Sequence, residues 1–249
     1  MRQDERKPEL SGRQGAEQVR AVVLILPGGQ VRSHRGRMRI AERGLRGLAR
    51  RFAAGGEPDG IAVHMVRYRF RGWNDESADT AADTRWALEE VQRRYGDVPV
   101  ALFGHSLGGR AAFWCAGHPS VTSVVGLSPW LPAGDPVDQL AGRKALIMHG
   151  DKDRSDASPQ LSLAFARRAR QVTPDVARFE VVGGGHLMID RGKDCGRLAA
   201  EFLFATIGSR PFSPLLAEAL KPEGDLGTPV PVGYNDELKK ATAPDTAQQ

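Results

Sequence analysis

Residues 98–109 read VPVALFGHSLGG, and the rest of the chain is best interpreted outward from this stretch. Its first six residues form a short apolar run of strand length. The segment that follows carries Ala, Phe and Trp and is closed by Gly117 and Pro119, which is typical of a short helix. The glycine-serine pattern of residues 104–108 therefore lies where a strand turns into a helix.

A serine at such a turn is well placed for chemistry. In a G-x-S-x-G turn the chain reverses so sharply that the apex residue takes a strained backbone conformation, and the flanking glycines avoid collisions with neighbouring backbone. Ser106 occupies the apex. Its hydroxyl is expected to project clear of the sheet, and the following helix directs backbone N–H groups toward negative charge that develops beside it. The pattern predicts that Ser106 is a nucleophile.

Residues 104–108 resemble the nucleophile elbow of the α/β-hydrolase superfamily in sequence and in context, and the resemblance extends over about residues 21–208. Within the superfamily the chain is most similar to small lid-less serine esterases and to dienelactone-hydrolase-like proteins. The latter are associated with a cysteine nucleophile, whereas position 106 is serine. The resemblance implies a mostly parallel, doubly wound α/β sheet and a catalytic triad in the chain order Ser, acid, His.

The acid is expected in residues 149–153, which follow a predicted strand at 144–148. A carboxylate there can hold an imidazole in the tautomer that leaves its other nitrogen basic. The resembling family places its acid in a His-Gly-x-x-Asp pattern at this turn, which selects Asp153. Asp151 and Asp156 are the alternatives, and all three aspartates are also ordinary turn-forming residues.

Six histidines compete for the role of general base. His186 follows three glycines directly after the last predicted strand, at the edge where α/β sheets bind ligands. As the third member of the ordered set it is the predicted general base. The other five histidines are interpreted as structural: His34, His64, His105, His118 and His149.

The oxyanion of such a reaction needs two backbone donors. One is the N–H of Leu107, and the other is expected in the loop after strand Ala21–Leu26, from Gly29 or Gln30. In the resembling family this loop carries a His-Gly sequence, whereas Pro27 stands here in place of the histidine. The chemistry requires no metal and no organic cofactor.

The remaining sequence alternates predicted strands and helices, which indicates a parallel, doubly wound sheet of about six strands. Only a short connection separates the strand that ends at Leu127 from the one that begins at Lys144, so no cap domain is expected. Ser158 and Pro159 are typical of a helix start. The predicted strands are 21–26, 61–69, 98–103, 121–127, 144–148 and 178–182, and the predicted helices are 38–52, 80–95, 159–171 and 194–207.

The chain divides into three predicted parts. Residues 1–19 are polar and are predicted to be a flexible leader, and residues 20–208 form the α/β-hydrolase domain. Residues 209–249 contain repeated prolines between polar residues and are predicted to be an extended or disordered tail. Within this tail the apolar segment 212–220 is a candidate for docking on the domain or on a second chain.

Composition excludes several classes of function. No apolar run of about 18 residues occurs and the N-terminus lacks a signal sequence, so neither membrane association nor secretion is expected and a cytoplasmic location follows. The two cysteines are too few for a disulfide framework or a metal site and are interpreted as reduced structural thiols. The net charge of +5 comes from arginine, and Arg39, Arg43, Arg46 and Arg50 lie on the outer face of the amphipathic segment 38–52. Without a recognised module or stacking aromatics, no nucleic-acid partner is expected.

Four side chains are candidates for the substrate pocket, because they lie near the same sheet edge: Trp73 and Trp130 as walls, and Arg71 and Arg32 as a site for an anionic substrate. The leading hypothesis is a serine hydrolase that cleaves a small carboxylic ester or thioester through an acyl-enzyme on Ser106. An acyltransferase with the same triad is the alternative enzyme, and a non-catalytic binding protein of this fold is the alternative from another class.

Overall fold

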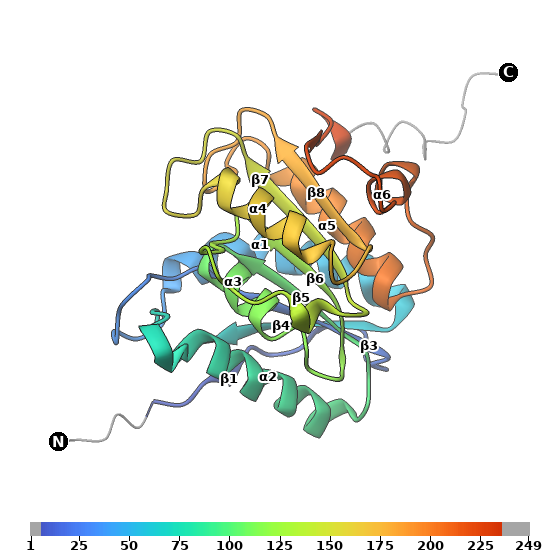
Figure 1. Ribbon diagram of the computed structural model, residues 1–249. Helices are drawn as coiled ribbons and strands as arrows, with labels where there is room; N and C mark the ends of the chain where they lie inside the picture. Colours follow the sequence, from blue (N-terminus) through green and yellow to red (C-terminus); the bar gives the residue numbers. More distant parts are fainter. Residues whose placement is uncertain (1–5, 236–249) are drawn as a thin grey trace, which may run out of the picture.

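Six parallel strands form the centre of the sheet in the computed structural model, which describes residues 6–235 (Figure 1). Over residues 6–235 the sheet has nine strands in the order β1-β4-β3-β5-β6-β7-β8-β9, with β2 also paired to β4. The expected doubly wound α/β class is confirmed, and the strand count exceeds the predicted six because three two-residue strands are added at the edges. The six central strands are β3 (Ala21–Leu26), β4 (Ile61–Arg67), β5 (Val100–His105), β6 (Val121–Leu127), β7 (Lys144–Gly150) and β8 (Val176–Val181).

Helices cover both faces of this sheet, which explains why its strands are apolar on both sides. All six residues of β3 are buried. One apolar core lies between the sheet and the helices α1 (Arg39–Gly56), α5 (Gly192–Ile207) and α6 (Pro214–Ala219). The opposite core lies beneath the helices α2 (Asp79–Tyr95), α3 (Leu107–Trp114) and α4 (Pro159–Ala169).

The connections between these elements are short. The 3-10 helices are η1 (Glu57–Asp59), η2 (Asp75–Ser77) and η3 (Asp138–Leu140), and only η3 interrupts the connection from β6 to β7. As predicted, no cap domain lies between these strands, and Ser158 caps α4 by accepting a hydrogen bond from the Leu161 amide. Within residues 6–235, no helix has the length and apolar character needed to cross a bilayer. Both cysteines, Cys115 and Cys195, are buried free thiols.

The N-terminal segment is part of the sheet where it is described, so the expectation of a flexible leader is wrong for it. The strands β1 (Glu9–Leu10) and β2 (Gln14–Gly15) pair antiparallel to β4. Between them the Ser11 hydroxyl accepts a hydrogen bond from the Met65 amide at 2.8 Å. A strand of two residues is too short to show the alternation of apolar and polar residues that predicts a strand. The prediction therefore rested on polar composition alone. The first five residues of the predicted leader lie outside the described part.

The C-terminal segment is also ordered through residue 235. Helix α6 (Figure 1) packs its apolar side on the domain, with Leu216 fully buried. The strand β9 (Thr228–Pro229) pairs parallel to β8. The prolines occur at positions that structure favours, Pro214 at the start of a helix and Pro229 on an edge strand. The prediction of disorder is therefore wrong for 209–235, while the rest of the predicted tail, 236–249, lies outside the described residues.

Candidate active site

The turn between β5 and α3 has the strained geometry that the sequence predicts. Ser106 has φ 55° and ψ −119°, a conformation that side-chain-bearing residues rarely adopt. A Cβ atom at Gly104 would collide with the backbone of Gly108, and one at Gly108 would collide with the carbonyl oxygen of Leu26. Both glycines are required because the helix passes directly over the ends of β3 and β5.

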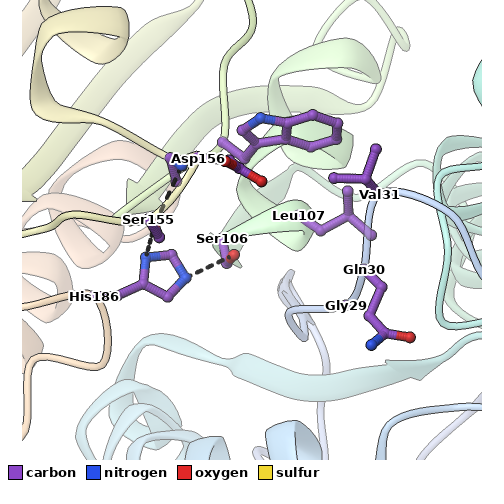
Figure 2. Close-up of a pocket in the computed structure, with 10 residues that line it drawn as sticks. Gly29, Gln30, Val31, Ser106, Leu107, Ser155, Asp156 and His186 are labelled. Carbon is purple, nitrogen blue, oxygen red and sulfur yellow. Dashed lines mark hydrogen bonds between the residues drawn. The ribbon is translucent and has the colours of Figure 1, made fainter.

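Three side chains from separate loops meet at the carboxyl edge of the sheet. The Ser106 hydroxyl oxygen lies 2.9 Å from Nε2 of His186, on the loop after β8 (Figure 2). On the other side of the ring, Nδ1 of His186 lies 2.7 Å from Oδ2 of Asp153, on the loop after β7. An ionised carboxylate can only accept, so Nδ1 carries the proton and Nε2 accepts the hydroxyl hydrogen.

The buried carboxylate of Asp153 is well supplied with donors. Its Oδ1 accepts hydrogen bonds from the Ser155 amide at 3.0 Å and the Ser155 hydroxyl at 2.7 Å. Burial alone would raise the pKa of Asp153, but the hydrogen bonds from His186 and Ser155 outweigh it and hold the pKa below its ordinary value. The carboxylate therefore stays ionised and fixes the tautomer of His186. The sequence interpretation missed Ser155, although an aspartate followed two residues later by serine is a common turn pattern.

The rival aspartates occupy other positions in the structure. Oδ1 of Asp151 accepts a hydrogen bond from the Gly183 amide at 2.7 Å, which ties the glycine-rich loop to the loop after β7. Asp156 lines the cavity beside the serine. Of the three candidate aspartates, Asp153 is the one whose carboxylate is hydrogen-bonded to the His186 ring.

His149 also lies against the triad carboxylate, with its Nε2 at 3.2 Å from Oδ2 of Asp153 and at 2.7 Å from the Ala157 carbonyl oxygen. Desolvation by burial is the main reason that the pKa of His149 falls to about 4. The ring is therefore neutral, and its Nε2–H donates to the Ala157 carbonyl. His149 holds the ends of the acid loop together.

His105, inside the elbow, reaches across to the loop of the predicted base. Its Nε2 lies 3.0 Å from the backbone carbonyl oxygen of His186, and the two imidazole rings are 5.2 Å apart between centroids. Burial lowers the pKa of His105 to about 4, so the ring is neutral and its Nε2–H donates to that carbonyl. The elbow thus holds the backbone of the histidine loop as well as presenting the serine.

The loop after β3 borders the serine on the side opposite His186 (Figure 2). The Gln30 amide donates to the Arg71 carbonyl at 2.7 Å, so it is already engaged. A Cβ atom at Gly29 would collide with the same carbonyl and with the Leu107 side chain. Gly29 therefore fits between the backbone of Arg71 and the side chain of Leu107 only because it lacks a side chain.

A cavity of about 280 Å³ opens over the serine. Trp130 is one of its lining residues, and Figure 2 shows Ser155 and Asp156 on one side and Gly29, Gln30 and Val31 on the other. The complete lining is Gly29, Gln30, Val31, Ser106, Leu107, Trp130, Ser155, Asp156, Ala157 and His186. The sequence interpretation did not anticipate Val31 or Ala157 as lining residues.

Two predicted pocket residues lie elsewhere. Trp73 is buried beneath α3, where it packs edge-on against Trp114 with ring centroids 5.3 Å apart and receives the Arg110 guanidinium 3.9 Å from its ring centroid. Arg71 does not line the cavity, and its backbone carbonyl instead fixes Gln30. Arg32 points to solvent and pairs with Asp75 at 2.8 Å. Neither arginine lines the cavity, so the structure does not support the predicted site for an anionic substrate.

A metal centre has no counterpart among the described residues, since no group of three or more His, Cys, Asp or Glu side chains is arranged to hold an ion. The carboxylates near the serine are instead engaged with amides, a hydroxyl and imidazoles.

In sequence, the chain matches no protein-family model and no curated protein. In structure it is similar to an α/β serine hydrolase homologue from Coxiella burnetii, with 16% identity, a TM-score of 0.57, and coverage of 79% of this chain and 90% of the other. It is also similar to an α/β serine hydrolase without a lid from Xanthomonas campestris, with 15% identity, a TM-score of 0.59, and coverage of 82% and 91%.

A third similar structure is Est1E from Butyrivibrio proteoclasticus, solved with ferulic acid bound. Its identity is 14% and its TM-score 0.59, with coverage of 80% of this chain and 95% of the other. At these identities the likeness establishes the architecture alone. The chain has the fold of the α/β-hydrolase superfamily.

Proposed function

We propose that the protein is a serine hydrolase that cleaves a small carboxylic ester or thioester through an acyl-enzyme on Ser106. The observation that carries this proposal is the continuous hydrogen-bonded relay from Asp153 through His186 to the Ser106 hydroxyl. A binding protein of this fold would gain nothing from a strained serine held against an oriented imidazole.

The geometry supports a two-stage reaction. In the first stage, Nε2 of His186 takes the hydroxyl proton as the Ser106 oxygen bonds to the carbonyl carbon. The tetrahedral intermediate then expels the alcohol or thiol, which leaves with the proton from His186. In the second stage, His186 removes a proton from water, the hydroxide bonds to the acyl carbon, and the acid is released as Ser106 regains its proton.

The oxyanion formed in each stage is assigned to the backbone N–H groups of Leu107 and Gly29. Leu107 is the first residue of α3, so its amide has no acceptor within the helix and adds to the positive end of the helix dipole. Gly29 is preferred over Gln30 because the Gln30 amide already donates to the Arg71 carbonyl. Loss of one oxyanion donor typically costs about 3 kcal/mol in the barrier.

The cavity favours a small, uncharged acyl group. Its volume of about 280 Å³ is at the low end for ligand pockets, and it is lined by apolar Val31, Leu107, Trp130 and Ala157. Asp156 is the one carboxylate in the lining, and no Lys or Arg joins it there. Esters with an anionic acyl group should therefore react more slowly than neutral esters of the same size.

Covalent labelling tests the proposal directly. A fluorophosphonate probe should label the folded wild-type protein, and Ser106→Ala and His186→Ala should abolish labelling because nucleophile or base is lost. Ser155→Ala tests whether the probe bonds to the other serine in the cavity lining, although it also removes one hydroxyl donor to Asp153. That variant should still be labelled. Folded wild-type protein that resists labelling, or labelling that persists in Ser106→Ala, would contradict the assignment and favour a binding protein.

A further inference from the structure

A second cavity, of about 340 Å³, lies at the carboxyl edge of the sheet beyond β4. Its walls come from the N-terminal segment up to the first residue of β1, the loop that leads into α1 with the first residue of that helix, and the end of β4 with the chain that leaves it. It shares no lining residue with the catalytic cavity. The basic cleft, as it is called below, is lined by Arg6, Lys7, Glu9, Gly36, Arg37, Arg39, Arg67, Tyr68 and Arg69.

The charge in the basic cleft is strongly one-sided, because six of its lining residues are Arg or Lys and Glu9 is the single carboxylate among them. One oxygen of Glu9 lies between two guanidinium groups, 3.5 Å from Arg37 and 3.3 Å from Arg67. Arg37 has a second carboxylate at 3.5 Å, that of Glu42. These separations are long for charge-assisted hydrogen bonds, which are usually 2.7–2.9 Å. The two guanidinium groups thus keep donors available for another anion.

Two cations of the basic cleft are held in place by other contacts. Arg69 pairs with the buried Asp83 at 2.5 Å. Arg6 donates to the His34 carbonyl at 3.0 Å, which ties the N-terminal segment to the loop before α1. A preorganised set of donors binds an anion at less entropic cost than flexible surface side chains do.

Helix α1 adds to the positive potential. Its N-terminus begins at Arg39 in the basic cleft, and no side chain caps it. A cation in the first turn is unfavourable, because the helix dipole is already positive at this end. An anion in the basic cleft would compensate Arg39 and the dipole together.

We infer that the basic cleft binds the phosphoryl group of a small phosphorylated molecule. Guanidinium forks match phosphate oxygens in geometry and charge. The volume leaves room for a diphosphate or for one phosphate with part of its organic group. Binding of a single-stranded nucleic acid is disfavoured, because such binding uses aromatic rings on which bases stack. The ring of Phe70 is already in contact with Arg6, Arg69 and His34. This inference does not depend on the proposed hydrolase activity.

Calorimetric titration of the full chain with pyrophosphate, and separately with orthophosphate, tests the inference. Arg37→Gln and Arg67→Gln should each raise the dissociation constant for pyrophosphate about tenfold, since each removes one charge-assisted contact. Arg46→Gln is the matched control, because it makes the same charge change on the exposed side of α1. Its dissociation constant should stay within about twofold of the wild-type value.

Two further variants separate a specific site from loss of structure. Glu9→Gln should tighten pyrophosphate binding, because it removes the carboxylate that competes for Arg37 and Arg67, and unfolding cannot produce a gain. Ser106→Ala should bind pyrophosphate like wild type, even if it abolishes labelling. The inference is overturned if wild type binds neither anion, if Arg46→Gln weakens binding as much as the cleft variants, or if Glu9→Gln does not tighten it. It is also overturned if oligonucleotides bind more tightly than pyrophosphate, with affinity that rises with their length.

Discussion

The imidazole of His186 is held by its backbone as well as by its ring. Asp153 and Ser106 contact the two ring nitrogens, and the His105 side chain binds the carbonyl oxygen of the same residue. Three glycines precede His186, so its loop has few side chains of its own to hold it. We therefore regard His105 as a positioning residue for His186, the proposed general base.

Removing the His105 donor should slow the reaction without unfolding the protein. His105→Phe keeps an aromatic ring but cannot donate to the His186 carbonyl, and a net hydrogen bond of about 1 kcal/mol corresponds to a rate loss of roughly five- to tenfold. The rate of fluorophosphonate labelling measures this loss. His105→Gln, which retains an N–H donor, should recover most of the rate. Equal losses in both variants would show that the ring fills space and does not position His186.

The triad positions could be predicted because each follows a strand in a known chain order, so local sequence places each at the same sheet edge. The direction in which a loop side chain points depends on contacts with distant segments, so the neighbouring sequence does not predict it. Trp73 follows β4 as predicted, but its ring turns under α3 toward Trp114 and Arg110. Likewise the bond from His105 to His186 spans 81 positions and depends on how two loops meet.

At the scale of elements, the segments at both ends of the chain complete the sheet and its cores. Helix α6 and the residues after β9 contribute Leu216, Val230 and Tyr234 to the core beneath α5. The long strands and helices were predictable from apolar runs and helical periodicity. The terminal elements were not, because two-residue strands have no period and their stability comes from contacts with β4 and β8.

Truncating the buried side chain of α6 tests its role. Leu216 is fully buried, and Leu216→Ala should lower the free energy of unfolding by about 2–5 kcal/mol, as expected when a leucine is removed from a packed core. Urea denaturation measures this change. Val232→Ala is the control in the same segment, because Val232 is 77% exposed and its change should stay within about 0.5 kcal/mol. A change below about 1 kcal/mol at Leu216 would mean that α6 does not stabilise the fold.

At the scale of the whole molecule, buried neutral histidines connect stability to pH. Burial is the largest cause that lowers the pKa of His149, to about 4, and it also lowers the pKa of His64. Both side chains are almost completely inaccessible. In the unfolded chain these groups return toward a pKa of about 6.5, so between pH 6.5 and 4 the unfolded state binds more protons than the folded one. Stability should therefore fall as the pH decreases through this range.

The free energy of unfolding, measured by urea denaturation from pH 7 to 5, should decrease with a contribution on the order of 2 kcal/mol from His149 alone. In the variant His149→Gln this contribution to the pH dependence of the free energy of unfolding should be absent, whatever the absolute stability of the variant. His34→Gln, at an exposed position, should leave the slope unchanged. A wild-type stability that is constant between pH 7 and 5 would contradict the prediction.

The short strand β9 has a consequence for the behaviour of the protein at high concentration. It covers part of β8, and its second residue is Pro229, which has no N–H with which to recruit a further strand. A protease that cuts the chain between α6 and Thr228 would release this cover while leaving the loops after β5, β7 and β8 intact. The bare rim of β8 would then be free to pair with the same rim of a neighbouring molecule, so protein with such a cut should aggregate while the geometry around Ser106 is still intact.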